Sequence, residues 1–325
     1  MQSPTRKKIL EIFTNKQNEF VSGEELAKLL GCSRTAVWKH IEELRKEGFQ
    51  LEALRKKGYR IIDTKDRVSE NEIQLGLKTK KLGCTIYYVE SIDSTQKLAH
   101  SLVQDGCPEG TIVVAEEQLN GRGRLARTWF SPKYSGIWMS VILRPTLPPK
   151  MSPQFTLIAA IAVVQAIAEN TTLHPEIKWP NDILINGKKV SGILTELQAD
   201  SDKVHAIIIG IGINVNQKQF PDELKQIATS LFIESGKETK RSHLIQAILE
   251  KIETYYQIYM EKGFAPLKLL WESYAVSIGK DIIAHTLNGD IIGKAIGITD
   301  EGVLKLEDQD EKVHLIYSAD IEIQS

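Results

Sequence analysis

The order of apolar and polar positions in the first part of the chain predicts a series of short helices. Between residues 6 and 13 the apolar side chains recur at helical spacing, which indicates a helix with one buried face. Ser22 is a suitable N-cap for a second helix, because Glu25 stands three residues later in the capping-box position, and Gly31 can end that helix.

A third helix and a hairpin follow. Ser33 can cap a helix that runs to about Glu47. The inner face of this helix is expected to consist of Val37, Ile41 and Leu44. Over residues 49–62 two apolar runs flank a basic, glycine-containing turn at 55–58, and this pattern indicates a β-hairpin. Two helices joined by a glycine-containing turn and followed by a hairpin predict a winged helix-turn-helix over residues 1–63.

Charge points to the partner of this first domain. Residues 1–63 hold 13 Lys+Arg and 9 Asp+Glu, whereas residues 64–325 hold 28 and 33, so a small basic segment precedes a larger acidic one. We expect the start of the third helix to meet base edges in a major groove, and the tip of the hairpin to contact phosphates or a minor groove. The residues expected to contact DNA are Ser33, Arg34, Thr35, Lys39, His40, Arg55, Lys56 and Lys57. The alternative is a helical hairpin used for protein contacts.

The rest of the chain predicts a linker and two further domains, so the fold class is multi-domain α+β. Residues 64–82 are polar and are interpreted as a linker with a short helix around 70–77. Over 83–274 strand-like and helical patterns alternate, which favours an α/β domain around one central mixed sheet. The expected strands are 86–89, 112–115, 137–143, 183–185, 193–197 and 206–211, and the expected helices are 94–104, 155–170 and 242–262. Over 275–325 short β runs with glycine turns suggest a small β-barrel.

Composition narrows the class of protein. The chain has 325 residues, of which 42% are hydrophobic and 26% charged, as in ordinary globular proteins of two or three domains. The three cysteines, Cys32, Cys84 and Cys107, are widely spaced, so neither a disulfide framework nor a zinc site is supported. The N-terminus does not have the pattern of a signal peptide, and the apolar run 155–168 is too short to span a bilayer, so a buried helix, no membrane contact and a cytoplasmic location are expected.

A loop rich in glycine and arginine is the most informative motif. It covers residues 118–129, directly after the strand expected at 112–115. Gly121 and Gly123 are expected to adopt positive φ angles and to let the backbone approach a ligand. Arg122, Arg124 and Arg127 suit phosphate or carboxylate groups held at short range. No Gly-Lys-Ser/Thr follows, so this is not a Walker loop. The alternatives are a flexible basic surface loop or an RNA-binding segment.

Three weaker motifs accompany this loop. Lys178-Trp179-Pro180-Asn181-Asp182 stands just before an expected strand, where the lysine could neutralise a phosphate, although a surface turn has the same composition. Ser91–Gln96 opens a helix, where hydroxyl and backbone N–H groups converge, although capping alone explains it. Residues 210–216 contain Gly-x-Gly without a third glycine in register, so a dinucleotide-binding motif is excluded.

Together these motifs resemble the bifunctional biotin–protein ligases of bacteria, which are also repressors of biotin operons. The likeness covers the whole chain, from a winged helix through a ligase domain to a small SH3-like β-barrel. It rests on Gly-Arg-Gly-Arg at 121–124, Lys-Trp-Pro-Asn-Asp at 178–182, Ser-Gly-Ile-Leu-Thr-Glu at 191–196 and Gly-Ile-Asn at 212–214, in the order that the family has them. The lipoate–protein ligases share the domain fold but differ in the glycine loop.

The resemblance implies roles for individual residues. The residues that it places around biotin are Ser94, Thr95, Gln96, Gln118, Arg122, Gly123, Arg124 and Lys178. Those that it places around the nucleotide are Arg122, Arg124, Arg127, Trp129, Asn181 and Asn214. Lys178 and Arg124 are the catalytic candidates, whereas residues that bind a metal cannot be named. Gln96 departs from members that have asparagine there, and Thr195 has no assignable role.

The implied reaction joins a carboxylate to the α-phosphate of ATP and expels pyrophosphate, which requires fixed positive charge and Mg²⁺. A loop that closes over the adenylate would protect it from water until a lysine of the biotin carboxyl carrier protein arrives. Biotin, ATP, this carrier and operator DNA are therefore the implied partners, and a homodimer is expected on a palindromic operator. The alternatives are a transcription factor that senses a ligand without catalysis and a ligase for lipoate or octanoate.

Overall fold

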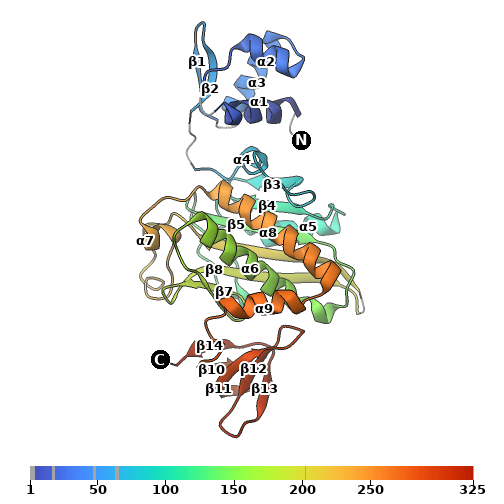
Figure 1. Cartoon of the computed structure of the whole chain (residues 1–325), viewed down its shortest axis with the longest axis vertical. Coiled ribbons are helices and arrows are strands. Elements are labelled where there is room, and N and C mark those ends of the chain that lie inside the picture. Colours follow the sequence, from blue (N-terminus) through green and yellow to red (C-terminus); the bar gives the residue numbers. More distant parts are fainter. Residues whose placement is uncertain (1–3, 17–18, 47–48, 63–65, 202, 325) are drawn as a thin grey trace.

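The computed structural model describes residues 4–16, 19–46, 49–62, 66–201 and 203–324. Three bodies follow one another along its longest axis, with the N-terminal body at one end and the C-terminal body at the other (Figure 1). The predicted end of the third helix at Glu47 and the predicted boundary between residues 63 and 64 lie outside the described residues.

The N-terminal body is a winged helix-turn-helix, as predicted. It consists of α1 (Pro4–Asn15), α2 (Gly23–Leu30), α3 (Arg34–Lys46) and a hairpin of β1 (Leu51–Leu54) and β2 (Gly58–Ile61). The Ser22 Oγ accepts from Glu25 N at 3.0 Å, Gly31 ends α2 with a φ of 63°, and the Ser33 Oγ accepts from Ala36 N at 3.2 Å. The predicted inner face of α3 is fully buried against α1 and α2. Local caps and one apolar stripe therefore specify this body.

The segment that we predicted as a linker is packed over most of its length. It contains the predicted short helix, α4 (Glu70–Gln74), which ends earlier than residue 77. Val68, Ile73 and Leu82 are buried in the main core of the central body. The Gln246 Nε2 donates to the carbonyl oxygens of Glu72, Ile73 and Leu75 at 2.7–3.0 Å. From Asp66 onward the chain therefore lies against the central body.

The central body is built on a seven-stranded mixed sheet of order β3-β4-β5-β9-β8-β7-β6. Only the β3–β4 pair is parallel among its ladders, and the other pairs are antiparallel. The strands are β3 (Thr85–Val89), β4 (Thr111–Ala115), β5 (Gly136–Leu143), β6 (Glu176–Lys178), β7 (Asp182–Ile185), β8 (Lys188–Ala199) and β9 (Val204–Asn214). All six predicted strands are present, but β8 and β9 are longer than predicted, and the three-residue β6 was missed because it is too short for a periodic pattern.

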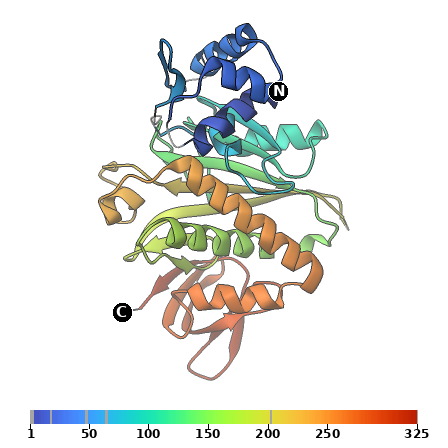
Figure 2. The same ribbon diagram turned by 45° about the horizontal axis from the view of Figure 1, so that its top comes forward.

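Helices cover both faces of this sheet. One face packs on α5 (Thr95–Gln104), and the other packs on α6 (Pro153–Asn170) and α8 (Arg241–Lys262), which lie on the same side in both views (Figures 1 and 2). These three helices were predicted. Two further helices, α7 (Leu231–Ser235) and α9 (Ala265–Tyr274), were not. The expectation that the apolar segment around 155–168 is too short to span a bilayer was wrong, because Pro149–Asn170 is long and apolar enough to cross a membrane. However, 72% of its most apolar window is buried in the protein, as expected of a core helix.

The C-terminal body is a five-stranded antiparallel sheet of order β13-β12-β11-β10-β14. Its strands are β10 (Asp281–Thr286), β11 (Gly289–Ile298), β12 (Leu304–Glu307), β13 (Val313–Ile316) and β14 (Asp320–Ile323). The predicted glycine turns are present, since Gly289 and Gly302 both have positive φ. The indole N–H of Trp179 donates to the Gly302 carbonyl at 3.2 Å in a buried contact, so this body rests directly on the central one.

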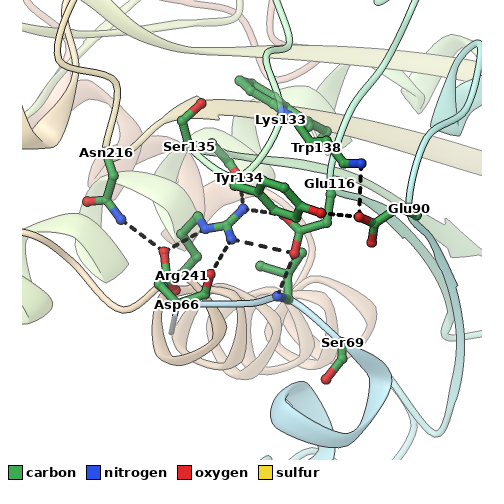
Figure 3. Close-up of polar contacts among 12 residues, drawn as sticks. Asp66, Ser69, Glu90, Glu116, Lys133, Tyr134, Ser135, Trp138, Asn216 and Arg241 are labelled. Atoms are coloured by element: carbon green, nitrogen blue, oxygen red, sulfur yellow. Dashed lines mark hydrogen bonds and ion pairs between the residues drawn. The ribbon is translucent and has the colours of Figure 1, made fainter. Parts of the chain in front are cut away.

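A fully buried arginine joins the start of the central body to its sheet (Figure 3). Arg241, at the start of α8, donates to Glu116 at 2.7 Å, to Asp66 at 2.6 Å and to the Gly136 carbonyl at 3.0 Å. Glu116 is equally buried and also accepts from the Val68 backbone N–H. The side chain of Arg241 thus fixes the C-terminal end of β4, the N-terminal end of β5 and the first described residues after the winged helix.

Candidate functional site

A cavity of about 540 Å³ opens between the central sheet and the C-terminal body. Every residue that the sequence placed around biotin or nucleotide lines it. They are Ser94, Thr95, Gln96, Gln118, Arg122, Gly123, Arg124, Arg127, Trp129, Lys178, Asn181 and Asn214. These residues come from four separate segments of the chain, which the sheet brings to one place.

One wall of the cavity is neutral and rich in hydrogen-bonding groups. The Gln118 Oε1 accepts from the Thr95 backbone N–H at 2.9 Å and from the Thr95 hydroxyl at 3.1 Å, while its Nε2 donates to Ser131 at 3.0 Å. The Ser94 Oγ and the Gln96 Oε1 are buried and have no hydrogen-bond partner among the described residues. Buried polar groups are normally paired, so two such atoms together indicate that this wall receives a polar ligand.

Contacts outside the cavity hold this wall in place. Glu90, one residue before Ser91–Gln96, accepts from the Tyr134 hydroxyl and forms an ion pair with Lys133 at 2.9 Å (Figure 3). Hydrogen bonds from Tyr134, Tyr88 and Lys133 lower the pKa of Glu90 to about 2. The carboxylate therefore stays charged at neutral pH and links the turn before α5 to the chain that follows the glycine loop.

The glycine loop folds back on itself. The Gly123 N–H donates to the Arg127 carbonyl at 2.7 Å, and the Trp129 N–H donates to the Gly121 carbonyl at 2.9 Å. The expectation of positive φ at the two glycines was wrong: Gly123 has a φ of −111°, and the positive values fall at Leu125 and Ala126. Gly121 is needed for space instead, because a Cβ there would lie 2.5 Å from the Trp129 carbonyl oxygen.

Cationic groups define the opposite end of the cavity. Arg124 donates to the Asn181 Oδ1 at 3.2 Å and to the Ser318 hydroxyl at 2.8 Å, and its burial lowers its pKa. Arg127 pairs with Asp320, and this hydrogen bond lowers the pKa of the carboxyl group. Lys178 ends β6, opposite Asp182 in the ladder with β7, and its charge also favours ionised Asp320.

An aromatic surface separates the two ends. The Lys189 ammonium lies 5.3 Å from the centre of the Trp129 ring and 2.6 Å from the Asp182 carboxylate. The Trp129 indole fits here because Gly212 has no side chain; a Cβ there would lie 2.4 Å from the Trp129 Nε1. The Gly-x-Gly pattern of β9, which is not a dinucleotide motif, therefore makes room for side chains that line the cavity.

Sequence reasoning missed several residues of this site. Ser318 and Asp320 reach it from the C-terminal body, and Lys189, Phe220, Ile227 and Ala228 line the cavity or contact Trp129. In the sequence, these residues stand in segments that look like ordinary turns and strands. Only the tertiary fold brings them to the glycine loop, so nothing in the sequence marks them.

The candidate DNA-contacting residues form a separate group on the N-terminal body. Ser33, Arg34, Thr35 and Lys39 are exposed at the start of α3, and Arg55, Lys56 and Lys57 are exposed at the hairpin tip, whereas His40 is half-buried. Within the described residues no three His, Cys, Asp or Glu side chains cluster as metal ligands. Asp182 and Asp320 are carboxylates that line the cavity near the cationic end.

Comparison with known proteins agrees with this organisation. The profile of the biotin/lipoate A/B protein ligase family matches residues 88–214, a helix-turn-helix profile matches 5–60, and the profile of the biotin protein ligase C-terminal domain matches 277–323.

The chain is 57% identical to the bifunctional ligase/repressor BirA of Bacillus spizizenii over 99% of its length and 100% of that relative. It is 27% identical to the protein of the same name from Escherichia coli over 92% of its length and 91% of that relative. Among solved structures, the Aquifex aeolicus biotin protein ligase in complex with biotin and ATP is 32% identical, has a TM-score of 0.63 and covers 74% of this chain and 99% of its own.

Proposed function

This chain belongs to the family of bifunctional biotin–protein ligases and repressors, and we propose that it performs both activities of that family. As an enzyme it forms biotinyl-5'-AMP from biotin and ATP and transfers biotin to a lysine of a biotin carboxyl carrier protein. As a repressor it binds the operator of biotin genes in response to biotin. We expect both activities to take place in the cytoplasm.

The observation that carries the enzymatic proposal is the cavity itself. It joins a neutral, hydrogen-bonding wall to a cationic end across the Trp129 ring. Biotin has a neutral ureido ring and an anionic carboxylate, and a buried ureido group needs hydrogen bonds. We assign Ser94, Thr95, Gln96 and Gln118 to the ureido ring.

The cationic end suits the reacting carboxylate and the α-phosphate. Arg124 and Lys178 are the residues that we assign there as catalytic groups, with Arg122 and Arg127 on the phosphates and Trp129, Asn181 and Asn214 on the nucleotide. Two anions must meet, so positive charge fixed in place lowers the barrier by electrostatic stabilisation and positioning.

Mg²⁺ fits this end of the cavity. It binds ATP phosphates with few protein ligands, and Asp182 and Asp320, the carboxylates among the residues that line the cavity, are the groups that would hold such an ion. When bound, Mg²⁺ would neutralise phosphate charge. The protein's own contribution is to orient the carboxylate of biotin, to place guanidinium and ammonium groups beside the phosphates and to keep water out.

The glycine loop supplies the cover. It carries Arg122, Gly123 and Arg124, and the exposed Leu125 stands at its tip. A mixed anhydride hydrolyses in water, so a loop that tightens over it keeps the intermediate until the carrier lysine attacks.

For the repressor activity we assign the DNA contacts to the start of α3 and the hairpin tip. Operators read by winged helices in pairs are palindromic, so a homodimer that presents two such domains is the proposed DNA-binding form. An ordered glycine loop over biotinyl-adenylate would complete the dimer surface.

The test compares ligands and reactions. Two measurements distinguish a biotin ligase from a ligase for lipoate and from a sensor without catalytic activity. They are the calorimetric binding of biotin and of lipoate, and the biotin-dependent exchange of labelled pyrophosphate into ATP. Tight binding of biotin with exchange supports the proposal. Preference for lipoate would indicate a ligase for another acid, and binding of biotin without exchange would indicate a sensor that has no catalytic activity.

A further inference from the structure

A chain of polar side chains leads from the protein surface to the neutral wall of the cavity. It begins at Gln198 on β8, passes through His100 on α5 and Glu196 on β8, and ends at Gln96, which lines the cavity. The first three of these residues are absent from the assignments above. Their contacts determine the direction in which the Gln96 amide is held.

The direction of each hydrogen bond in this chain is fixed by the groups that form it. The Gln198 Nε2 lies 3.1 Å from the His100 Nδ1 and donates also to the His100 carbonyl at 3.1 Å. An amide nitrogen can only donate, so the Nδ1 accepts and the ring proton of neutral His100 lies on Nε2. That Nε2 donates to the Glu196 Oε2 at 3.1 Å.

Glu196 then fixes the amide of Gln96. The Gln96 Nε2 donates to the Glu196 Oε2 at 2.9 Å and to the Leu194 carbonyl at 3.3 Å. With the amide nitrogen held by two acceptors, the Oε1 must point the other way. A flipped amide would set its oxygen against a carboxylate and a carbonyl, which is repulsive.

The Gln96 Oε1 therefore needs a hydrogen-bond donor. The Gln96 Oε1 is buried, and no described residue donates to it. Gly210 leaves the space that this amide occupies, because a Cβ at Gly210 would lie 3.0 Å from the Oε1 and 2.9 Å from the Cδ. Gln96, Leu194 and Gly210 all line the cavity. A ligand with an N–H group can therefore satisfy an acceptor that the protein leaves without a partner.

We propose that Glu196, oriented by His100, is a positioning residue that holds the Gln96 amide with its oxygen as an acceptor for a ring N–H of the substrate. This inference rests on the proposed function and deepens it, since it concerns which carboxylic acid is chosen. The ureido ring of biotin supplies N–H donors, whereas the dithiolane ring of lipoate supplies none. A site built around a buried acceptor rejects an analogue that leaves that acceptor without a partner.

The experiment measures the dissociation constants of biotin and lipoate for the full-length parent and for Glu196→Ala, Gln96→Leu and the double variant. We expect Glu196→Ala to weaken biotin binding about tenfold, the worth of one hydrogen bond, and to leave lipoate binding unchanged. The KM for ATP should not move. In the Gln96→Leu background Glu196→Ala should cause no further loss, because Glu196 acts through Gln96. Glu196→Gln keeps an acceptor for the Gln96 Nε2 and should restore biotin affinity to within about threefold of the parent.

Asp200→Ala is the matched control. Asp200 follows β8 and pairs with His205 of β9 at 2.8 Å, so it is also a carboxylate–histidine pair, but neither residue lines the cavity. This variant should bind biotin as the parent does. The side chain of Glu196 is 41% exposed, so its removal is expected to leave the fold intact, which a thermal melt checks.

Unchanged biotin affinity in Glu196→Ala, or additive losses in the double variant, would overturn the inference. Failure of the proposed function has a different signature, since the parent itself would then prefer lipoate or lack pyrophosphate exchange. The two outcomes are therefore distinguishable in one set of measurements.

Discussion

The Nη1 of Arg241 lies 2.7 Å from the Oε2 of Glu116, and neither side chain has any exposed surface. Two charges in that position have lost their hydration, and each depends on the other for compensation. Asp66 adds a second carboxylate at 2.6 Å, and the Gly136 carbonyl accepts as well. The pair lies between the chain that arrives from the winged helix and the strand that leads to the glycine loop (Figure 3).

Removal of this arginine should therefore destabilise the central domain strongly. Arg241→Met leaves Glu116 buried without a counter-ion, which costs about 3–5 kcal/mol in the free energy of unfolding. Urea denaturation of the variant and the parent gives that difference. Arg241→Met combined with Glu116→Leu should recover much of the loss, because no buried charge is left in the sheet.

Lys251→Ala is the control for the loss of a basic residue on the same helix. Lys251 pairs with Glu169, whose side chain is 57% exposed, so the change should alter the free energy of unfolding by less than about 1 kcal/mol. If the Arg241 and Lys251 variants lowered the free energy of unfolding equally, the buried pair of Arg241 and Glu116 would not be a special source of stability.

The sequence was most informative where structure is specified locally. Ser22, Gly31 and Ser33 act within one helical turn of their position, so the helices of the winged domain were predicted with nearly correct bounds. Strands such as β4 and β5 are largely apolar and buried along their whole length, and the pattern reveals this as well.

Contacts between distant segments could not be read in this way. Asp66 lies in a stretch interpreted as a linker, and its partner Arg241 is 175 residues away. Asp320 and Arg127 are likewise in different domains. The φ angles of the glycine loop were predicted incorrectly because Gly121 serves a steric need set by the Trp129 carbonyl, which only the folded loop brings close.

The position of Lys178 at the end of β6, facing the cationic end of the cavity, leads to a prediction about catalysis. Lys178→Ala should reduce biotin-dependent pyrophosphate exchange at least about a hundredfold, because a fixed charge beside the phosphate is lost. Biotin affinity should change far less, since the neutral wall is untouched. Lys188→Ala on β8 is a suitable control, because its ammonium donates to the Lys225 carbonyl outside the cavity. Near-normal exchange in Lys178→Ala would remove this residue from the mechanism.

Arg124 should matter more for retention of the adenylate than for its synthesis. Its guanidinium connects the glycine loop to Asn181 and to Ser318 of the C-terminal domain. Arg124→Gly removes both contacts, so the loop should close less firmly and the adenylate should escape faster, with biotin attached to nearby proteins at random. Rapid filtration after a single turnover measures the release rate. An intermediate kept as long as in the parent would contradict this role.

The last prediction concerns the two ends of the chain. A ligand can regulate DNA binding only if it favours one state of the protein over another, and a dimer that carries two winged helices is the simplest such state. Biotin with ATP should therefore tighten operator binding and increase the sedimentation coefficient together. Deletion of residues 1–64 should eliminate operator binding yet keep most of the ligase activity, because Asp66 and its contact with Arg241 remain. Deletion of residues 1–68 removes Asp66 and Val68 as well, and it should lower the melting temperature and the activity, since Arg241 then loses one of its two carboxylates and the core loses a buried side chain. Operator binding that is indifferent to biotin would contradict regulation by the ligand, and operator binding that survives the shorter deletion would show that DNA is bound elsewhere in the chain. Equal stability of the two truncated forms would show that residues 66–68 do not belong to the central domain.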